Sequence, residues 1–154
     1  MQAEERFEFA HEGQTGYIVI TREVRPDTGD GIGILMVNAP PGTLALKKKN
    51  PDVRVAAQVA WQRIWRPAVI QQAAENILAA VKEKDGAEPH SVDFVGRANN
   101  GKLVVQRKAN GISFTEQFDA GLGIAFELSV KTMKKLANLI LNIEVPIAEA
   151  AAQD

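Results

Sequence analysis

Apolar and polar residues alternate along the first third of the chain, as expected for β-strands. Residues 7–9 read apolar, polar, apolar, and residues 17–21 are mostly apolar on both faces, which predicts a strand buried on both sides. A Gly- and Asp-rich turn at 26–31 precedes residues 32–37, which we expect to return as the second strand of a hairpin. A short strand is expected at 43–46.

The middle of the chain carries apolar stripes with helical spacing. Asn50 is a good N-cap, and the apolar positions of residues 53–64 recur every three to four residues, which favours a helix. The alternation within residues 53–61 also permits a strand. Pro67 is expected to end or kink this helix, and residues 70–81 carry a second apolar stripe. We therefore expect two helices, or one helix bent at Pro67.

The second half predicts a four-strand meander and a final helix. The strands are expected at 92–97, 103–108, 112–118 and 124–128. The Asn110-Gly111 dipeptide between two of them is a strong hairpin signal, because both central residues of the tight turn need positive φ. Ser129 is expected to cap a helix whose buried stripe contains Met133, Leu136, Ala137 and Ile140.

The order of these elements is strands, helices, strands, helix. It predicts an α+β fold in which antiparallel meanders carry helices packed on one face. We expect one domain over residues 1–142, followed by a C-terminal extension over residues 143–154.

Composition narrows the function classes. The chain has 154 residues, 18 basic and 19 acidic side chains and a formal charge of −1, so it lacks the basic excess usual for a dedicated duplex-DNA binder. It contains no cysteine, which excludes disulfides, zinc–thiolate sites and cysteine nucleophiles. The acidic start lacks the pattern of a signal peptide, and no apolar run approaches the roughly 20 residues of a membrane span. The expected location is cytoplasmic, with no membrane contact.

Catalytic motifs are missing from the sequence. His11 and His90 have no further ligand at short helical or strand spacing. Residues 27–31 resemble a calcium-binding loop, but strands rather than helices are expected on either side. The glycines at 29, 31 and 33 precede a strand, whereas a phosphate-cradling loop must lead into a helix. We therefore expect no catalytic residue, no cofactor and no metal.

Aromatic and basic residues supply the candidate contact surface. Trp61 fits the predicted helical stripe, whereas Trp65 is expected to be exposed between Arg63 and Arg66. Residues 91–111 carry four basic residues against one acidic residue, Asp93. The basic candidates in this segment and in a second, all-lysine cluster are Arg97, Lys102, Arg107, Lys108, Lys47, Lys48 and Lys49.

These features predict a non-enzymatic protein-interaction or assembly module that forms homo-oligomers. Its partner would be another protein or further copies of itself. The alternative is a single-stranded nucleic-acid-binding protein that uses a basic β-sheet face. The succession of strands and helices resembles the topology of the Whirly-like single-stranded DNA binders, and this resemblance implies the alternative function.

Overall fold

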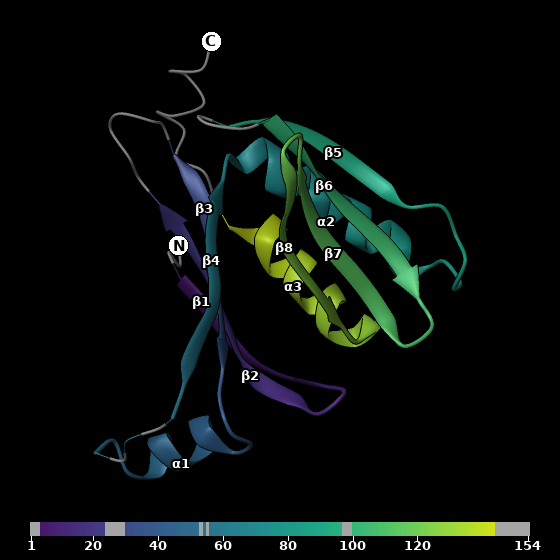
Figure 1. Cartoon of the computed structure of the whole chain (residues 1–154). Coiled ribbons are helices and arrows are strands. Elements are labelled where there is room, and N and C mark those ends of the chain that lie inside the picture. Colours follow the sequence, from purple (N-terminus) through teal and green to yellow (C-terminus); the bar gives the residue numbers. More distant parts are fainter. Residues whose placement is uncertain (1–3, 24–29, 53, 55, 97–99, 144–154) are drawn as a thin grey trace.

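The computed structural model describes residues 4–23, 30–52, 54, 56–96 and 100–143. Within these ranges the chain forms two four-stranded antiparallel sheets and three helices (Figure 1). Sheet 1 consists, in spatial order, of β1 (Glu4–His11), β2 (Gln14–Glu23), β3 (Gly31–Asn38) and β4 (Gln58–Trp65). Sheet 2 consists of β5 (His90–Val95), β6 (Asn100–Lys108), β7 (Gly111–Phe118) and β8 (Gly121–Leu128). The helices are α1 (Thr43–Lys49), α2 (Pro67–Val81) and α3 (Val130–Asn142).

The predicted α+β class with antiparallel meanders is confirmed. Each sheet is a simple meander, and each meander is followed by one long helix, α2 or α3. The short helix α1 interrupts the connection from β3 to β4 and lies at the end of sheet 1, away from α2 and α3 (Figure 1). None of the described helices is long and apolar enough to cross a membrane.

Sheet 1 is apolar on its inner face because every second residue of its strands turns towards the helices. Phe7 pairs with Ile18, Ile18 with Met36 and Met36 with Trp61, so one apolar row crosses all four strands. Val19 on the opposite face is also buried, at 5% exposure. The prediction that residues 17–21 are buried on both sides is confirmed for this valine.

The helix predicted over residues 53–64 is wrong, because Gln58–Trp65 is the strand β4. Its large aromatic and branched side chains pair with β3, and this long-range pairing outweighs the helix propensity of the alanines. Pro67 does not bend a helix; it occupies the first turn of α2, where its missing N–H has no role. The strand expected at 43–46 is also wrong, since these residues lie in or beside α1.

The two long helices cover sheet 2. α2 packs against β5, β6 and α3, and both helices lie along the same face of this sheet (Figure 1). The expected stripe of α3 is confirmed, with Met133, Leu136, Ala137 and Ile140 buried. Ser129 caps α3 as expected, because its side chain accepts a hydrogen bond from Thr132 N at 3.2 Å.

An aromatic seam joins the two sheets. Trp61 of β4 stacks on Phe126 of β8 with ring centroids 5.1 Å apart, and Phe126 stacks on Phe114 of β7 at 5.2 Å. Trp65 contacts the ring of Phe114 at 5.8 Å. The inner faces of both sheets, α2 and α3 thus share one hydrophobic core. Most of the predicted extension from residue 143 onward lies outside the described residues.

Candidate functional site

β4 forms an open edge of sheet 1. Among the strands that the structure describes its only partner is β3, and Gln58, Val59, Ala60 and Gln62 are exposed. Val59 keeps 64% of its surface exposed. One irregularity interrupts the β3–β4 register at Met36/Val37, while the residues from Trp61 to Trp65 pair regularly. The strand contains no carboxylate, lysine or proline, which are the residues that usually prevent an edge from pairing with another chain.

The other three edge strands differ from β4 in charge, length or contacts. β1 carries Glu4, Glu5, Arg6 and Glu8. β8 approaches β1, and the two edges are joined by side-chain contacts at one end. β5 has only six residues and carries Asp93. β4 and β8 each have eight residues and one charged side chain, but β8 contacts β1 at one end, so among the four described edges β4 offers the longer open row of backbone donors and acceptors.

Glu116 of β7 fixes the inner side of β4. This carboxylate is only 2% exposed and accepts hydrogen bonds from Trp65 Nε1 at 3.2 Å and from Arg63 Nε at 3.1 Å. It also lies 3.4 Å from the backbone nitrogen of Ile124, which donates to it. A Cβ at Gly123 would overlap the Glu116 carboxylate, so glycine gives this group its space. The end of β4 is thereby tied rigidly to sheet 2.

The expectation that Trp65 forms an exposed contact is wrong, because only 6% of its surface is exposed. In a strand, residues 61, 63 and 65 share one face, and here that face is the inner one. Arg63 follows the same alternation and reaches Glu116, although 40% of its side chain remains exposed. Trp61, expected in the core, is partly buried in the aromatic seam. Arg66, next in the chain, is exposed at the N-cap of α2.

The described basic candidates of sheet 2 are divided between its two faces. Arg107 points to the inner side, where it donates to the backbone oxygens of Glu83 at 3.2 Å and Gly111 at 3.1 Å. Lys102 is exposed but pairs in register with Asp93. Lys108 is half-buried at the end of β6. Arg97 lies outside the described residues.

The three-lysine cluster lies on α1, away from sheet 2. Lys47, Lys48 and Lys49 form the exposed last turn of α1, where their charge suits the negative end of the helix. The helix is separated from the basic residues of β6, so the two predicted basic groups do not form one surface (Figure 1).

Both histidines meet carboxylates that are not suggested by sequence spacing. His11 Nε2 lies 3.1 Å from Glu127 Oε2 and 3.8 Å from Glu12 Oε2. One ligand atom from each of these three residues lies within 4.8 Å of the others, which is close enough for one divalent cation. Asn110 donates to Glu12 at 3.1 Å, so in the structure the group acts as a polar clasp between the β1–β2 turn and sheet 2. His90 lies 2.8 Å from Glu83.

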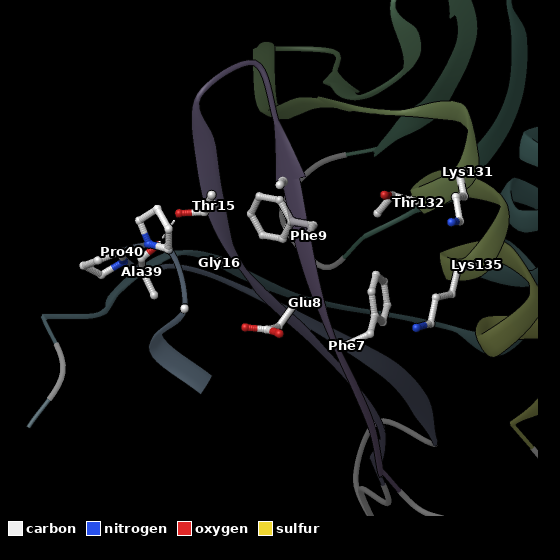
Figure 2. Close-up of a pocket in the computed structure, with 13 residues that line it drawn as sticks. Phe7, Glu8, Phe9, Thr15, Gly16, Ala39, Pro40, Lys131, Thr132 and Lys135 are labelled. Carbon is white, nitrogen blue, oxygen red and sulfur yellow. Dashed lines mark hydrogen bonds between the residues drawn. The ribbon is translucent and has the colours of Figure 1, made fainter. Parts of the chain in front are cut away.

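A groove separates the β1–β2 hairpin from the start of α3 (Figure 2). It encloses about 530 Å³ and is lined on one side by apolar residues that include Phe7, Phe9, Pro40 and Pro41. Lys131, Thr132 and Lys135 extend from α3 towards this side (Figure 2). Lys135 Nζ lies 5.2 Å from the ring centroid of Phe7, a cation–π contact.

Sequence reasoning missed Glu116 and the lysine wall of this groove. The lysines were recognisable only as residues off the buried stripe of the last helix, which is a common solvated position. Glu116 could have been noticed only as a carboxylate at a position of an alternating strand where an apolar residue is expected. Comparison of the chain with protein-family models, curated proteins and solved structures finds no match.

Proposed function

We propose that this protein is a non-enzymatic assembly module that pairs with a second copy of itself along β4. The observation that carries the proposal is the open edge of this strand, whose single charged residue, Arg63, is paired with Glu116. Unpaired backbone N–H and C=O groups on such an edge form a template for another strand. Pairing would join two copies of sheet 1 into one continuous sheet.

The charges around β4 favour an antiparallel copy of the same strand. Arg63 is its only charged residue, and this side chain is held on the inner face by Glu116. Arg66 lies just beyond one end, so in an antiparallel pair the two copies of Arg66 would be at opposite ends of the interface. Pairing would therefore keep the two copies of Arg66 apart, and it would cover Val59.

The expected affinity is modest. Each new backbone hydrogen bond contributes about 0.5–1.5 kcal/mol net, and the loss of translational and rotational freedom opposes association. An interface built mainly from one strand per copy also falls at the small end of specific protein interfaces. We therefore expect a reversible dimer whose population depends on protein concentration.

Sedimentation velocity over a concentration series tests the proposal. Val59→Lys with Gln62→Lys places two cations on the exposed side of β4 and should raise the dimer dissociation constant at least tenfold, about 1.4 kcal/mol. The matched control is Ser91→Lys with Val95→Lys on the edge of β5, where both residues are also exposed. The control should dimerise like the unmodified protein.

Two results would contradict the proposal. The unmodified protein could remain strictly monomeric at every concentration. Alternatively, the β4 variant could dimerise as well as the β5 variant, which would move the interface elsewhere. Circular dichroism melting of both variants separates lost pairing from lost folding.

A further inference from the structure

The groove between β1, β2 and α3 has two chemically different walls. Phe7, Phe9, Pro40 and Pro41 provide an apolar wall, and α3 provides Lys131, Lys135 and the hydroxyl of Thr132. Its volume of about 530 Å³ lies within the usual range for ligand pockets, roughly 300–1,000 Å³. A ligand that fits both walls combines negative charge with apolar groups.

The lysines of this wall are available to an anion. Lys131 and Lys135 are exposed, and neither forms a salt bridge with a described residue. The only interaction of Lys135 with a described side chain is the cation–π contact with Phe7, which leaves its three N–H donors free to bind an oxygen. Glu8 is the one carboxylate among the lining residues, so the lining is net basic although the whole chain is slightly acidic.

We propose that this groove binds single-stranded nucleic acid, with phosphates on the lysines of α3 and bases against the apolar wall. Phosphate contacts supply affinity, and exposed base faces pack on apolar and aromatic surfaces. A duplex hides those faces inside its stack, so it would engage the lysines alone. Phe7 and Phe9 are each 5% exposed, so bases would lie against ring edges and prolines and would not insert between rings.

This inference is independent of the pairing of β4. The groove is built from β1, β2, α3 and the segment from Ala39 to Gly42 of one copy. The β4 variant described above should therefore bind nucleic acid as well as the unmodified protein does. Failure of one proposal leaves the other standing.

Fluorescence anisotropy with a labelled oligothymidylate at low salt tests the groove. Lys131→Gln with Lys135→Gln should lower affinity at least fivefold. It should also flatten the slope of log K against log salt concentration by about 1.4, from about 0.7 for each of two lost phosphate contacts. The matched control is Lys82→Gln with Lys84→Gln, which removes the same charge from exposed positions after α2. The control should keep the affinity and the slope nearly unchanged.

Three outcomes would overturn the inference. The unmodified protein could fail to bind oligothymidylate at micromolar concentration in low salt. The control could lose as much affinity as the groove variant, which would indicate diffuse attraction. A polyglutamate peptide could displace the oligonucleotide at equal charge concentration, which would assign the groove to acidic protein segments.

Discussion

Glu116 offers the sharpest test of how the two sheets are held together. Replacing Glu116 by Ala removes the carboxylate that accepts from three donors, two of them in β4 and one in β8. Trp65 Nε1 and the backbone nitrogen of Ile124 are buried, at 3.2 and 3.4 Å from the carboxylate oxygens. Arg63 Nε, at 3.1 Å, belongs to a side chain that is 40% exposed.

The free-energy cost of losing the acceptor differs among the three donors. A buried donor left without an acceptor costs about 1–3 kcal/mol, and this applies to Trp65 and to Ile124, whose bond is the longer and weaker one. Arg63 can turn to water, so its lost ion pair should cost no more than about 1 kcal/mol. We expect a total loss of about 3 kcal/mol in the free energy of unfolding for Glu116→Ala.

Urea denaturation measures this loss, and thermal melting provides a second reading. For a chain of this size, each kcal/mol corresponds to a shift of about 2–4 °C, so the midpoint should fall by about 6–12 °C. Glu116→Gln keeps one acceptor oxygen and should lose less. Glu75→Ala removes an exposed carboxylate from α2 and should change stability by less than about 0.5 kcal/mol.

The stabilising role of the buried carboxylate is refuted if Glu116→Ala is as stable as Glu75→Ala. The larger contribution of the buried donors is refuted if Arg63→Ala alone is as damaging as Glu116→Ala, because the ion pair, and not the buried donors, would then dominate. A double-mutant cycle between Arg63 and Glu116 should give a coupling energy of no more than about 1 kcal/mol.

Two further substitutions test the core and a helix end. Trp65→Ala should lower the free energy of unfolding by about 3–5 kcal/mol, because it leaves a cavity beside Phe114. A variant with the same melting temperature as the unmodified protein would contradict the burial of Trp65. Ser129→Ala should cost about 1 kcal/mol through loss of the cap of α3, measured by urea denaturation; Ser129→Gly should lose less, and equal stability of all three proteins would argue against the cap.

The sequence predicted best where local and long-range preferences agree. The meander from β5 to β8 was expected because alternating segments flank a turn signal such as Asn110-Gly111, and its strands pair with chain neighbours. α2 and α3 were expected from apolar stripes that recur every three to four residues over at least two helical turns. In these regions the local sequence pattern is sufficient to distinguish a helix from a strand.

β4 was predicted wrongly because two periodicities coexist in it. Ala60, Trp61 and Ile64 fit a helical stripe, while Trp61, Arg63 and Trp65 fit a strand. The strand is selected by pairing with β3, whose residues lie at least twenty positions earlier in the chain, and by the contacts with the buried Glu116. The site residues depended on the same decision, since a strand carries Trp65 inward whereas a helix would expose it.

The position of α2 has a consequence for how the chain folds during synthesis. This helix follows the last strand of sheet 1 but packs against β5 and β6, which are synthesised after it. During synthesis, the apolar stripe of α2 stays exposed until β5 and β6 have been made. A fragment that begins at β5 would lack α2, which covers the inner face of these two strands. The segment that forms sheet 1 and α2 and the segment that forms sheet 2 and α3 therefore share one core, and we expect neither segment to fold without the other.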